Sequence, residues 1–193
     1  MQRTALCLAR CLAPLVFAPA SLAAQLQVTP APGWWESRTV LNVSGIDIVQ
    51  MQTQILAALP PEQREQAIAQ MKAAGVSTPE PGVARYCVSP AQAEKARDPA
   101  AAIGEVNRSV RQCRFEPTAV GATEVQFRGR CDDPRSFTGN VAGTFTMTEP
   151  KSWTINFQGR GTLAGITLGA PLPAQGRTVA RWVAADCAAQ ATK

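Results

Sequence analysis

The sequence contains no histidine among its 193 residues, and this absence excludes several kinds of enzyme. Histidine is the base of Ser-His-Asp triads and Cys-His pairs and a ligand in most catalytic zinc sites, so this chain alone cannot build those mechanisms. Beyond the N-terminal region, the chain also lacks an apolar run long enough to cross a bilayer. The hydrophobic fraction is 46%, which is far from a disordered composition and predicts a folded core.

The N-terminus has the pattern of a secretory signal peptide over residues 1–24. Arginines at the start precede an apolar run, and the small residues Ser21 and Ala23 suit cleavage on either side of Ala24. A membrane anchor needs about 20 uninterrupted apolar residues, whereas an arginine and two prolines interrupt this run. We expect a periplasmic protein, with secretion as the alternative, whose residues 25–193 form a single β-rich domain without an integral membrane segment.

Removal of the leader lowers the net charge from +5 to +3, because two arginines leave and all 14 acidic residues stay. Six of the remaining arginines resemble a nucleic-acid patch, but Glu116, Glu124, Asp132 and Asp133 are interleaved among them. Phosphate binding favours an uncompensated positive stripe. We therefore interpret the arginines as a solvated sheet face and expect no nucleic-acid partner; they are Arg108, Arg111, Arg114, Arg128, Arg130 and Arg135.

Four cysteines remain after the leader, and an even number in an exported chain predicts two disulfides. Three pairings are possible, and no two cysteines have the close spacing of a redox motif or a zinc knuckle. We favour Cys87 with Cys113 and Cys131 with Cys187. The first pairing closes a local excursion of the chain. The second ties a middle strand to the last strand, which suits a last strand that returns beside an earlier one.

Alternating polar and apolar residues predict a sheet of antiparallel strands. The alternating segments are residues 35–43, 83–88, 123–131, 137–148, 153–158 and 177–187. In the last segment Val179, Val183, Ala185 and Cys187 share one face. Several glycines fall on or near the apolar face, where they permit bends. The expected fold is mainly β within the α+β class, with a strongly curved antiparallel sheet or partly open barrel, one or two short helices inserted after the first strand, and two disulfides.

The helices are expected between the first strand and the middle of the chain. A proline pair begins a helix over residues 61–75, and Ser89-Pro90-Ala91-Gln92 has the spacing of a capping box. Asp98-Pro99 would end this second helix. Residues 46–59 are ambiguous because their apolar positions fit a helical face only loosely. Residues 162–176 are rich in glycine and proline and predict a mobile hairpin or loop.

Carboxylates are the remaining candidates for acid–base chemistry in a chain without histidine. Asp132 and Asp133 are adjacent and precede a proline, which is typical of a turn. Glu36 and Asp186 lie in predicted strands beside anchored residues, and we interpret both as structural. The chain shows no phosphate loop, metal-ligand cluster or nucleophile elbow. We therefore expect a protein that is not an enzyme, with no catalytic residue, no metal site and no cofactor.

Short motifs follow one another in a characteristic order: Pro32-Gly33-Trp34-Trp35-Glu36, Pro61-Glu62-Gln63, Cys87-Val88-Ser89-Pro90, Cys113, Cys131, and Arg181-Trp182 ahead of Cys187. This order resembles a bacterial family of exported proteins that is catalogued as domain of unknown function thirty-six seventeen. The resemblance covers nearly all of the chain after the leader, and the cysteine order is its most specific part. It implies a periplasmic protein of mainly antiparallel sheet and no established activity.

The aromatic residues of the predicted strands supply the candidate binding surface: Phe127, Phe145, Trp153 and Phe157. On the concave face of a curved sheet they would accept an apolar or amphipathic ligand, with residues 162–176 as a lid. The sequence thus favours a non-catalytic binding or carrier module. Two alternatives stay open: the aromatic residues fill a solid core, or the protein is a structural or interaction protein of the cell envelope, without a small ligand, whose protein partner docks on a polar face or an open sheet edge.

Overall fold

A computed structural model describes residues 25–73, 80–109, 112–134, 137–163 and 170–187, so the predicted leader lies outside the described residues. The elements of the first half are β1 (Gly33–Val43), β2 (Ile46–Asp47), α1 (Ile48–Ala58), α2 (Pro61–Ala73), β3 (Val83–Val88), α3 (Pro90–Lys95) and α4 (Pro99–Ser109). The second half consists of β4 (Cys113–Val120), β5 (Glu124–Asp132), β6 (Phe137–Glu149), β7 (Ser152–Leu163) and β8 (Leu172–Ala184).

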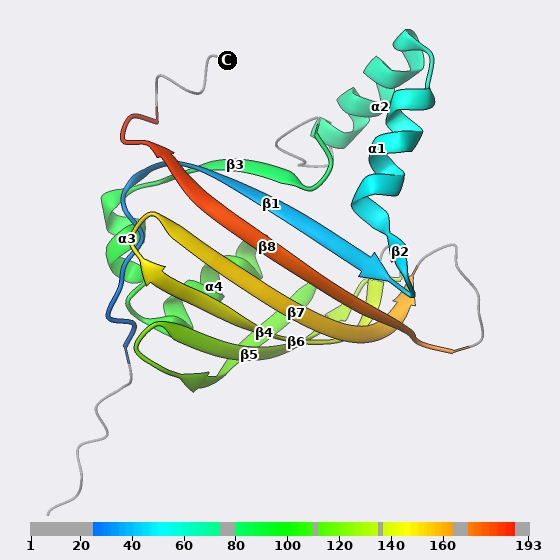
Figure 1. Cartoon of the computed structure of the whole chain (residues 1–193). Helices are drawn as coiled ribbons and strands as arrows, with labels where there is room; N and C mark the ends of the chain where they lie inside the picture. Colours follow the sequence, from blue (N-terminus) through cyan, green and yellow to red (C-terminus); the bar gives the residue numbers. More distant parts are fainter. Residues whose placement is uncertain (1–24, 74–79, 110–111, 135–136, 164–169, 188–193) are drawn as a thin grey trace, which may run out of the picture.

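The strands form one antiparallel, strongly curved sheet that does not close into a barrel, which confirms the predicted fold class (Figure 1). The order is β2-β1-β8-β7-β6-β5-β4, and β3 pairs with the first half of β1. From β4 to β8 each strand pairs with its successor, as short hairpin connections allow. The last strand, β8, returns beside β1 over almost its whole length. The sheet therefore joins the two ends of the described chain.

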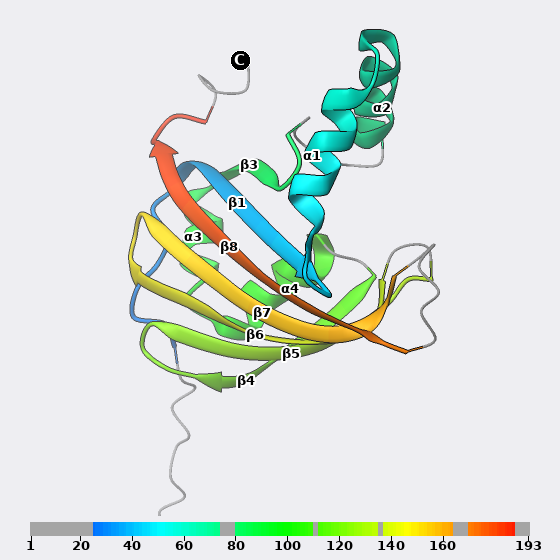
Figure 2. The same cartoon turned by 45° about the vertical axis from the view of Figure 1, so that its right-hand side comes forward.

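The sheet has an inner face, on the side where α3 and α4 lie, and an opposite outer face (Figure 2). Because side chains alternate along a strand, Trp35 and Val125 point inward and are buried, while their outer-facing neighbours are not. In β8 the inward positions include Ala180, which is fully buried, whereas Val183 is 49% exposed. Val179 and Val183 do share a face, as predicted, but it is the outer face.

The helices α1 and α2 project from the sheet as a hairpin (Figure 1). The ambiguous segment 46–59 contains α1, which starts where the Asp47 carboxylate accepts a hydrogen bond from the Gln50 backbone N–H at 2.9 Å. The predicted helix over 61–75 is confirmed as α2 as far as Ala73, and residues 74–75 lie outside the described residues. The Arg64 side chain of α2 donates to carbonyl oxygens at the end of α1, which ties the two helices together.

The capping box at the start of α3 is confirmed, with Ser89 and Gln92 each bonding the other's backbone N–H. The helix α4 was missed, because Pro99 begins a new helix after ending the previous one. The Asp98 carboxylate accepts the Ala100 N–H at 3.0 Å, so the Asp98-Pro99 pair is a helix start as well as a stop. Helix α4 is joined to β4 by Asn107, whose side chain bonds both backbone groups of Phe115.

The disulfides join Cys87 to Cys187 and Cys113 to Cys131, so the favoured pairing is wrong. Cys113 and Cys131 are directly opposed in the β4–β5 hairpin, with Cα atoms 3.9 Å apart. A register shift after Pro117 interrupts the alternation of β4, which hides this hairpin in the sequence. Cys87 and Cys187 lie on either side of the start of β1. The backbone of Ala184 and Ala185 packs directly against Gly33 and leaves no room there for a Cβ.

Two loops complete the frame of the inner face. The segment before β1 crosses one end of the sheet, where the Gln27 N–H donates to Ala122 at 2.8 Å and the Ala31 N–H to Pro150 at 2.7 Å. At the other end β7 and β8 extend into the predicted loop 162–176, and β8 already begins at Leu172. The middle of that loop, residues 164–169, lies outside the described residues.

Candidate functional site

Aromatic rings and glycines interlock on the inner face. A Cβ on Gly143 would approach the Phe127 ring to 2.6 Å, and one on Gly176 would collide with the Phe157 ring. In both cases the ring of one strand occupies the space that a side chain on the neighbouring strand would fill. The glycines that the sequence places on the apolar face therefore bring aromatic rings against the backbone.

All four aromatic residues proposed as a ligand surface point to the inner face, but they are not equally covered. Phe127 is 9% exposed and meets Phe115 edge-to-face, with ring centroids 5.7 Å apart, so it is already part of a packed core. Phe145, Trp153 and Phe157 are only half-buried. The ligand surface proposed from the sequence therefore narrows to these three residues.

Phe145 and Trp153 form a pair at the end of the sheet that the N-terminal segment crosses. Their ring centroids lie 5.7 Å apart, with an angle of 42° between the planes. Trp153 is opposite Ala180 on β8, which in turn is opposite Ser37 on β1. Because both neighbours are small, the indole has room to lie across these strands.

Tyr86 extends this cluster from β3, and sequence reasoning missed it. It pairs with the inward-facing Trp35, and its hydroxyl oxygen is buried without a hydrogen-bond partner of standard geometry among the described residues. Burial raises the pKa of Tyr86 well above its ordinary value of 10.0, and a hydrogen-bonding contact with the Trp153 side chain, outside standard geometry, opposes this shift only in part. A buried polar atom without a partner is rare and requires an explanation. The available signal was its position, as the one tyrosine of the chain, beside Cys87.

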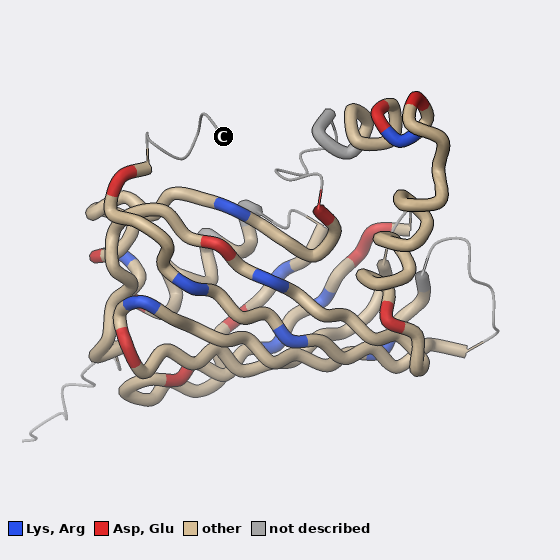
Figure 3. Tube along the Cα trace, turned by 45° about the horizontal axis from the view of Figure 1, so that its top comes forward, with Lys and Arg blue, Asp and Glu red and all other residues tan. Residues whose placement is uncertain are grey.

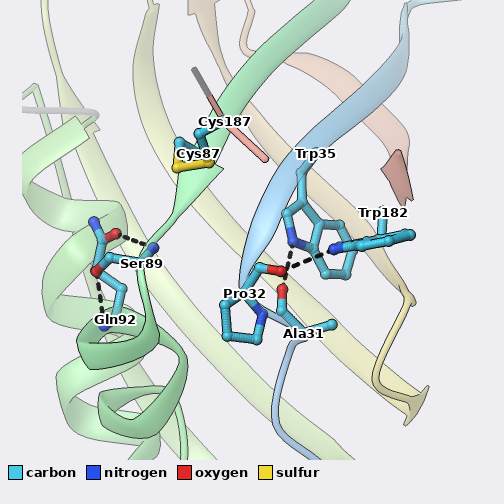
Figure 4. The surroundings of a disulfide bond; sticks show 8 residues. All are labelled: Ala31, Pro32, Trp35, Cys87, Ser89, Gln92, Trp182 and Cys187. Atoms are coloured by element: carbon cyan, nitrogen blue, oxygen red, sulfur yellow. Dashed lines mark hydrogen bonds between the residues drawn. A yellow bond between two sulfur atoms is a disulfide. The ribbon is translucent and has the colours of Figure 1, made fainter. Parts of the chain in front are cut away.

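The indole N–H groups of Trp35 and Trp182 are hydrogen-bonded (Figure 4), whereas the Tyr86 hydroxyl has no such bond among the described residues. The Trp35 indole N–H donates to the Ala31 carbonyl at 2.9 Å, and the Trp182 indole N–H donates to the Pro32 carbonyl, also at 2.9 Å. These bonds hold the N-terminal segment beside the Cys87–Cys187 disulfide. The two tryptophans are therefore framework residues of the candidate site.

Glu36 lies on the outer face and is held in a small ion-pair network. Its carboxylate oxygens are 2.9 Å from the Arg85 guanidinium and 3.0 Å from that of Arg38. A hydrogen bond from Arg85 lowers the pKa of Glu36 below its ordinary 4.5; burial opposes it, and a hydrogen bond from Arg38 together with both positive charges adds to the lowering. These contacts agree with a structural role for this carboxylate.

The described part of the chain has neither a metal-binding cluster nor a membrane-spanning helix. There, no group of three or more Cys, Asp or Glu side chains is arranged to hold a metal ion. None of the helices placed by the structure is long and apolar enough to cross a membrane.

Fold and inner face together define a class of open, antiparallel β-sheet proteins with two disulfides and an incompletely covered aromatic face. Residues 30–187 match the family described as "Protein of unknown function (DUF3617)", and the chain belongs to this family, as the order of its motifs indicated. Comparison with curated proteins and with solved structures gave no match.

Proposed function

We propose that this protein is an exported, non-catalytic binding or carrier module for an amphipathic ligand on the inner face of the sheet. In this proposal the leader over residues 1–24 is removed and residues 25–193 act as a single periplasmic domain. Two disulfides support an oxidising compartment. The half-buried residues Phe145, Trp153 and Phe157 contact the apolar part of the ligand.

The observation that carries the proposal is the unsatisfied Tyr86 hydroxyl beside the incompletely buried Trp153. A buried hydroxyl without a hydrogen bond and a partly exposed indole ring each lower the stability of the fold. In a protein that needed only a packed core, we would expect the hydroxyl to be hydrogen-bonded and the indole to be buried. A ligand with a polar end and an apolar body would hydrogen-bond the hydroxyl and cover the exposed part of the indole. Since the hydroxyl is covered, the Trp153 side chain moves aside for the ligand, and Ala180 and Ser37 leave it room.

Native mass spectrometry of the protein from cells expressing the full chain, before and after extraction with organic solvent, tests this proposal. We expect an extra mass that extraction removes and that returns when a C12–C18 fatty acid is added. Trp153→Leu should weaken this rebinding about tenfold, through loss of aromatic contact area. Val183→Ser, which alters an exposed apolar residue of the outer face, is the matched control.

Two results of these binding measurements would contradict the proposal. A protein that carries no extra mass and binds no fatty acid at millimolar concentration contradicts the proposal, as does equal binding by both variants. The intact mass also tests export, because a processed chain begins on one side or the other of Ala24. A mass that includes residues 1–24 would exclude the proposed processing.

A second candidate function, an envelope interaction protein without a small ligand, is favoured by one observation. The projecting helix α1 buries none of its residues, and Ile55 on it is 54% exposed. Exposed apolar side chains on a projecting element are typical of protein–protein contacts. Crosslinking in intact cells should then trap one reproducible protein, and Ile55→Ser should abolish the crosslink without changing fatty acid binding.

A further inference from the structure

The outer face carries a groove of about 1130 Å³ that crosses the strands from β1 to β4. Its lining includes Gly129 and Gly159 and, between them, outward-facing residues such as Arg130, Asn140 and Gln158. Six strands at a spacing of about 4.8 Å give it a length of roughly 24 Å. The groove is on the opposite face from the aromatic cluster, and no aromatic residue is among the described residues that line it.

The lining of this groove is strongly basic. Among the described residues that line it, four are arginines and one, Glu116, is acidic; the arginines are Arg114, Arg128, Arg130 and Arg160. The sequence suggested compensation by interleaved acids, but Glu124, Asp132 and Asp133 are not part of this lining. Arg160 comes from a strand outside the original arginine cluster. Glu124 and Asp132 share the outer face of β5 with Arg128 and Arg130 but lie outside the lining, while register adds Arg160 as a fourth positive charge. Figure 3 shows basic positions recurring along the strands of the sheet.

Two of these arginines are placed against each other. Arg114 and Arg130 are direct cross-strand partners, and Asn140 then links this row to Arg160 on β7. Like charges directly opposite each other in a sheet destabilise it. Within the described residues, Arg128, Arg130 and Arg160 make no ion pair of 4.0 Å or less. These three arginines therefore have no acidic side chain of the described residues within ion-pair distance.

The Cys113–Cys131 disulfide holds the opposed arginines in place. Cys113 and Cys131 form the cross-strand pair immediately before Arg114 and Arg130, so the covalent link keeps the two guanidinium groups on adjacent strands despite their repulsion. The Arg114 side chain also donates to the Cys113 carbonyl at 3.1 Å. A site whose charges are fixed before the ligand arrives loses less entropy on binding.

The other polar side chains of the groove are mostly amides, among them Asn140, Gln158 and Gln175. Arginine binds carboxylate and sulfate groups through paired N–H donors, and amides both donate to and accept from hydroxyls. Single-stranded nucleic acid is usually held by aromatic stacking, which this lining does not offer. We propose that the groove binds a linear acidic oligosaccharide, with the four arginines on its anionic groups and the amides on its hydroxyls.

Binding is measured by isothermal titration calorimetry on the full chain, produced under oxidising conditions that form both disulfides. The acidic probes are a heparin octasaccharide and an oligogalacturonate of the same length, and maltooctaose is the neutral control. We expect binding of an acidic probe that weakens as salt rises, because each arginine contact is electrostatic. We expect no binding of maltooctaose.

Matched variants locate the site. Arg130→Gln should weaken acidic-oligosaccharide binding about tenfold, and Arg130→Gln with Arg160→Gln about a hundredfold. Arg181→Gln makes the same chemical change on an exposed β8 residue outside the groove lining and should leave the affinity unchanged. Glu116→Gln removes the one carboxylate of the lining and should tighten binding. A gain of affinity cannot result from loss of folding, so this variant keeps the test decisive.

Several results would overturn the proposal. They are absence of binding of both acidic probes at low salt, equal binding of maltooctaose, equal affinity of the Arg130→Gln and Arg181→Gln variants, and weaker binding after Glu116→Gln. Tighter binding of oligothymidine or of phosphatidylglycerol vesicles than of either acidic oligosaccharide would assign the groove to a different partner and would also exclude it. Because the fatty acid test probes the other face, the two proposals fail independently.

Discussion

The two faces of the sheet are built from alternate residues of the same strands, and they differ in which energetically unfavourable feature each one keeps. On the inner face, rings lie over glycines, and the unresolved group is the Tyr86 hydroxyl. On the outer face, polar side chains line a groove, and two like charges, Arg114 and Arg130, are direct cross-strand partners. Local costs of this kind concentrate at functional positions. Each face therefore keeps one arrangement that folding alone does not require.

Removal of the disulfides should give the largest effects and should separate the two faces. The pairs Cys87–Cys187 and Cys113–Cys131 span 100 and 18 residues. In the chain-entropy account, double replacement by alanine lowers the free energy of unfolding by about 5 kcal/mol for the first pair and about 3 kcal/mol for the second. Urea unfolding measures both values. Where the variants still fold, loss of Cys113–Cys131 should weaken oligosaccharide binding more than fatty acid binding. The reverse order would contradict the assignment of the two ligands to opposite faces.

Substitutions at Gly143 and Ala142, adjacent positions of β6, compare how tightly the inner and outer faces are packed. Gly143→Ala should lower the free energy of unfolding by about 1–3 kcal/mol, because the new methyl group meets the Phe127 ring and the Asn156 carbonyl. Ala142→Ser, on the exposed outer face, should change it by less than about 0.5 kcal/mol. Thermal unfolding of both variants checks the difference. Equal costs would mean that the inner face is not tightly packed around this ring.

Tyr86→Phe should raise the free energy of unfolding of the ligand-free protein by about 1 kcal/mol, since it removes a buried hydroxyl without a partner. It should also change the pH dependence. The pKa of Tyr86 is raised in the folded state, so its contribution to stability is complete below the ordinary value of 10.0 and is lost as pH rises above it. Tyr86→Phe should lack this alkaline loss.

The chain has one tyrosine, so alkaline absorbance titration reports Tyr86 without interference from other phenols. In the folded protein the phenol should ionise well above pH 10. Ionisation at the ordinary value, with the protein still folded, would show that the hydroxyl is solvated. The inner face would then have no unresolved group, and the contrast with the outer face would disappear.

The sequence was informative about the sheet because alternation reports directly which residues share a face. Prediction from the sequence failed where one local pattern is compatible with two structures. Asp98-Pro99 both ends α3 and starts α4, and the register shift after Pro117 hides the hairpin that pairs Cys113 with Cys131. In β8 the inward residues that precede Ala180, among them Gly176 and Thr178, are small or polar, so the apolar pattern of Val179 and Val183 marked the outer face.

The candidate sites were less accessible from sequence because they depend on neighbours across strands. The four aromatic residues were correctly placed on one face, but burial of Phe127 depends on Phe115 and on the glycines beside it. Tyr86 carries no motif, and its significance comes from burial next to Trp153. The groove arises from register, which brings Arg160 into one row with Arg130, while Glu124 and Asp132 lie on the same face but outside the lining.

The most direct test of the proposed function is quenching of tryptophan fluorescence by a brominated fatty acid. Of the four tryptophans, Trp35 is fully buried and Trp182 is bonded to Pro32, so a ligand on the inner face should quench Trp153 most strongly. Trp153→Phe should then remove most of the quenching that saturating ligand produces, while Trp182→Phe should retain it. Equal quenching in both variants, or none in the native protein, would contradict a ligand site at Trp153.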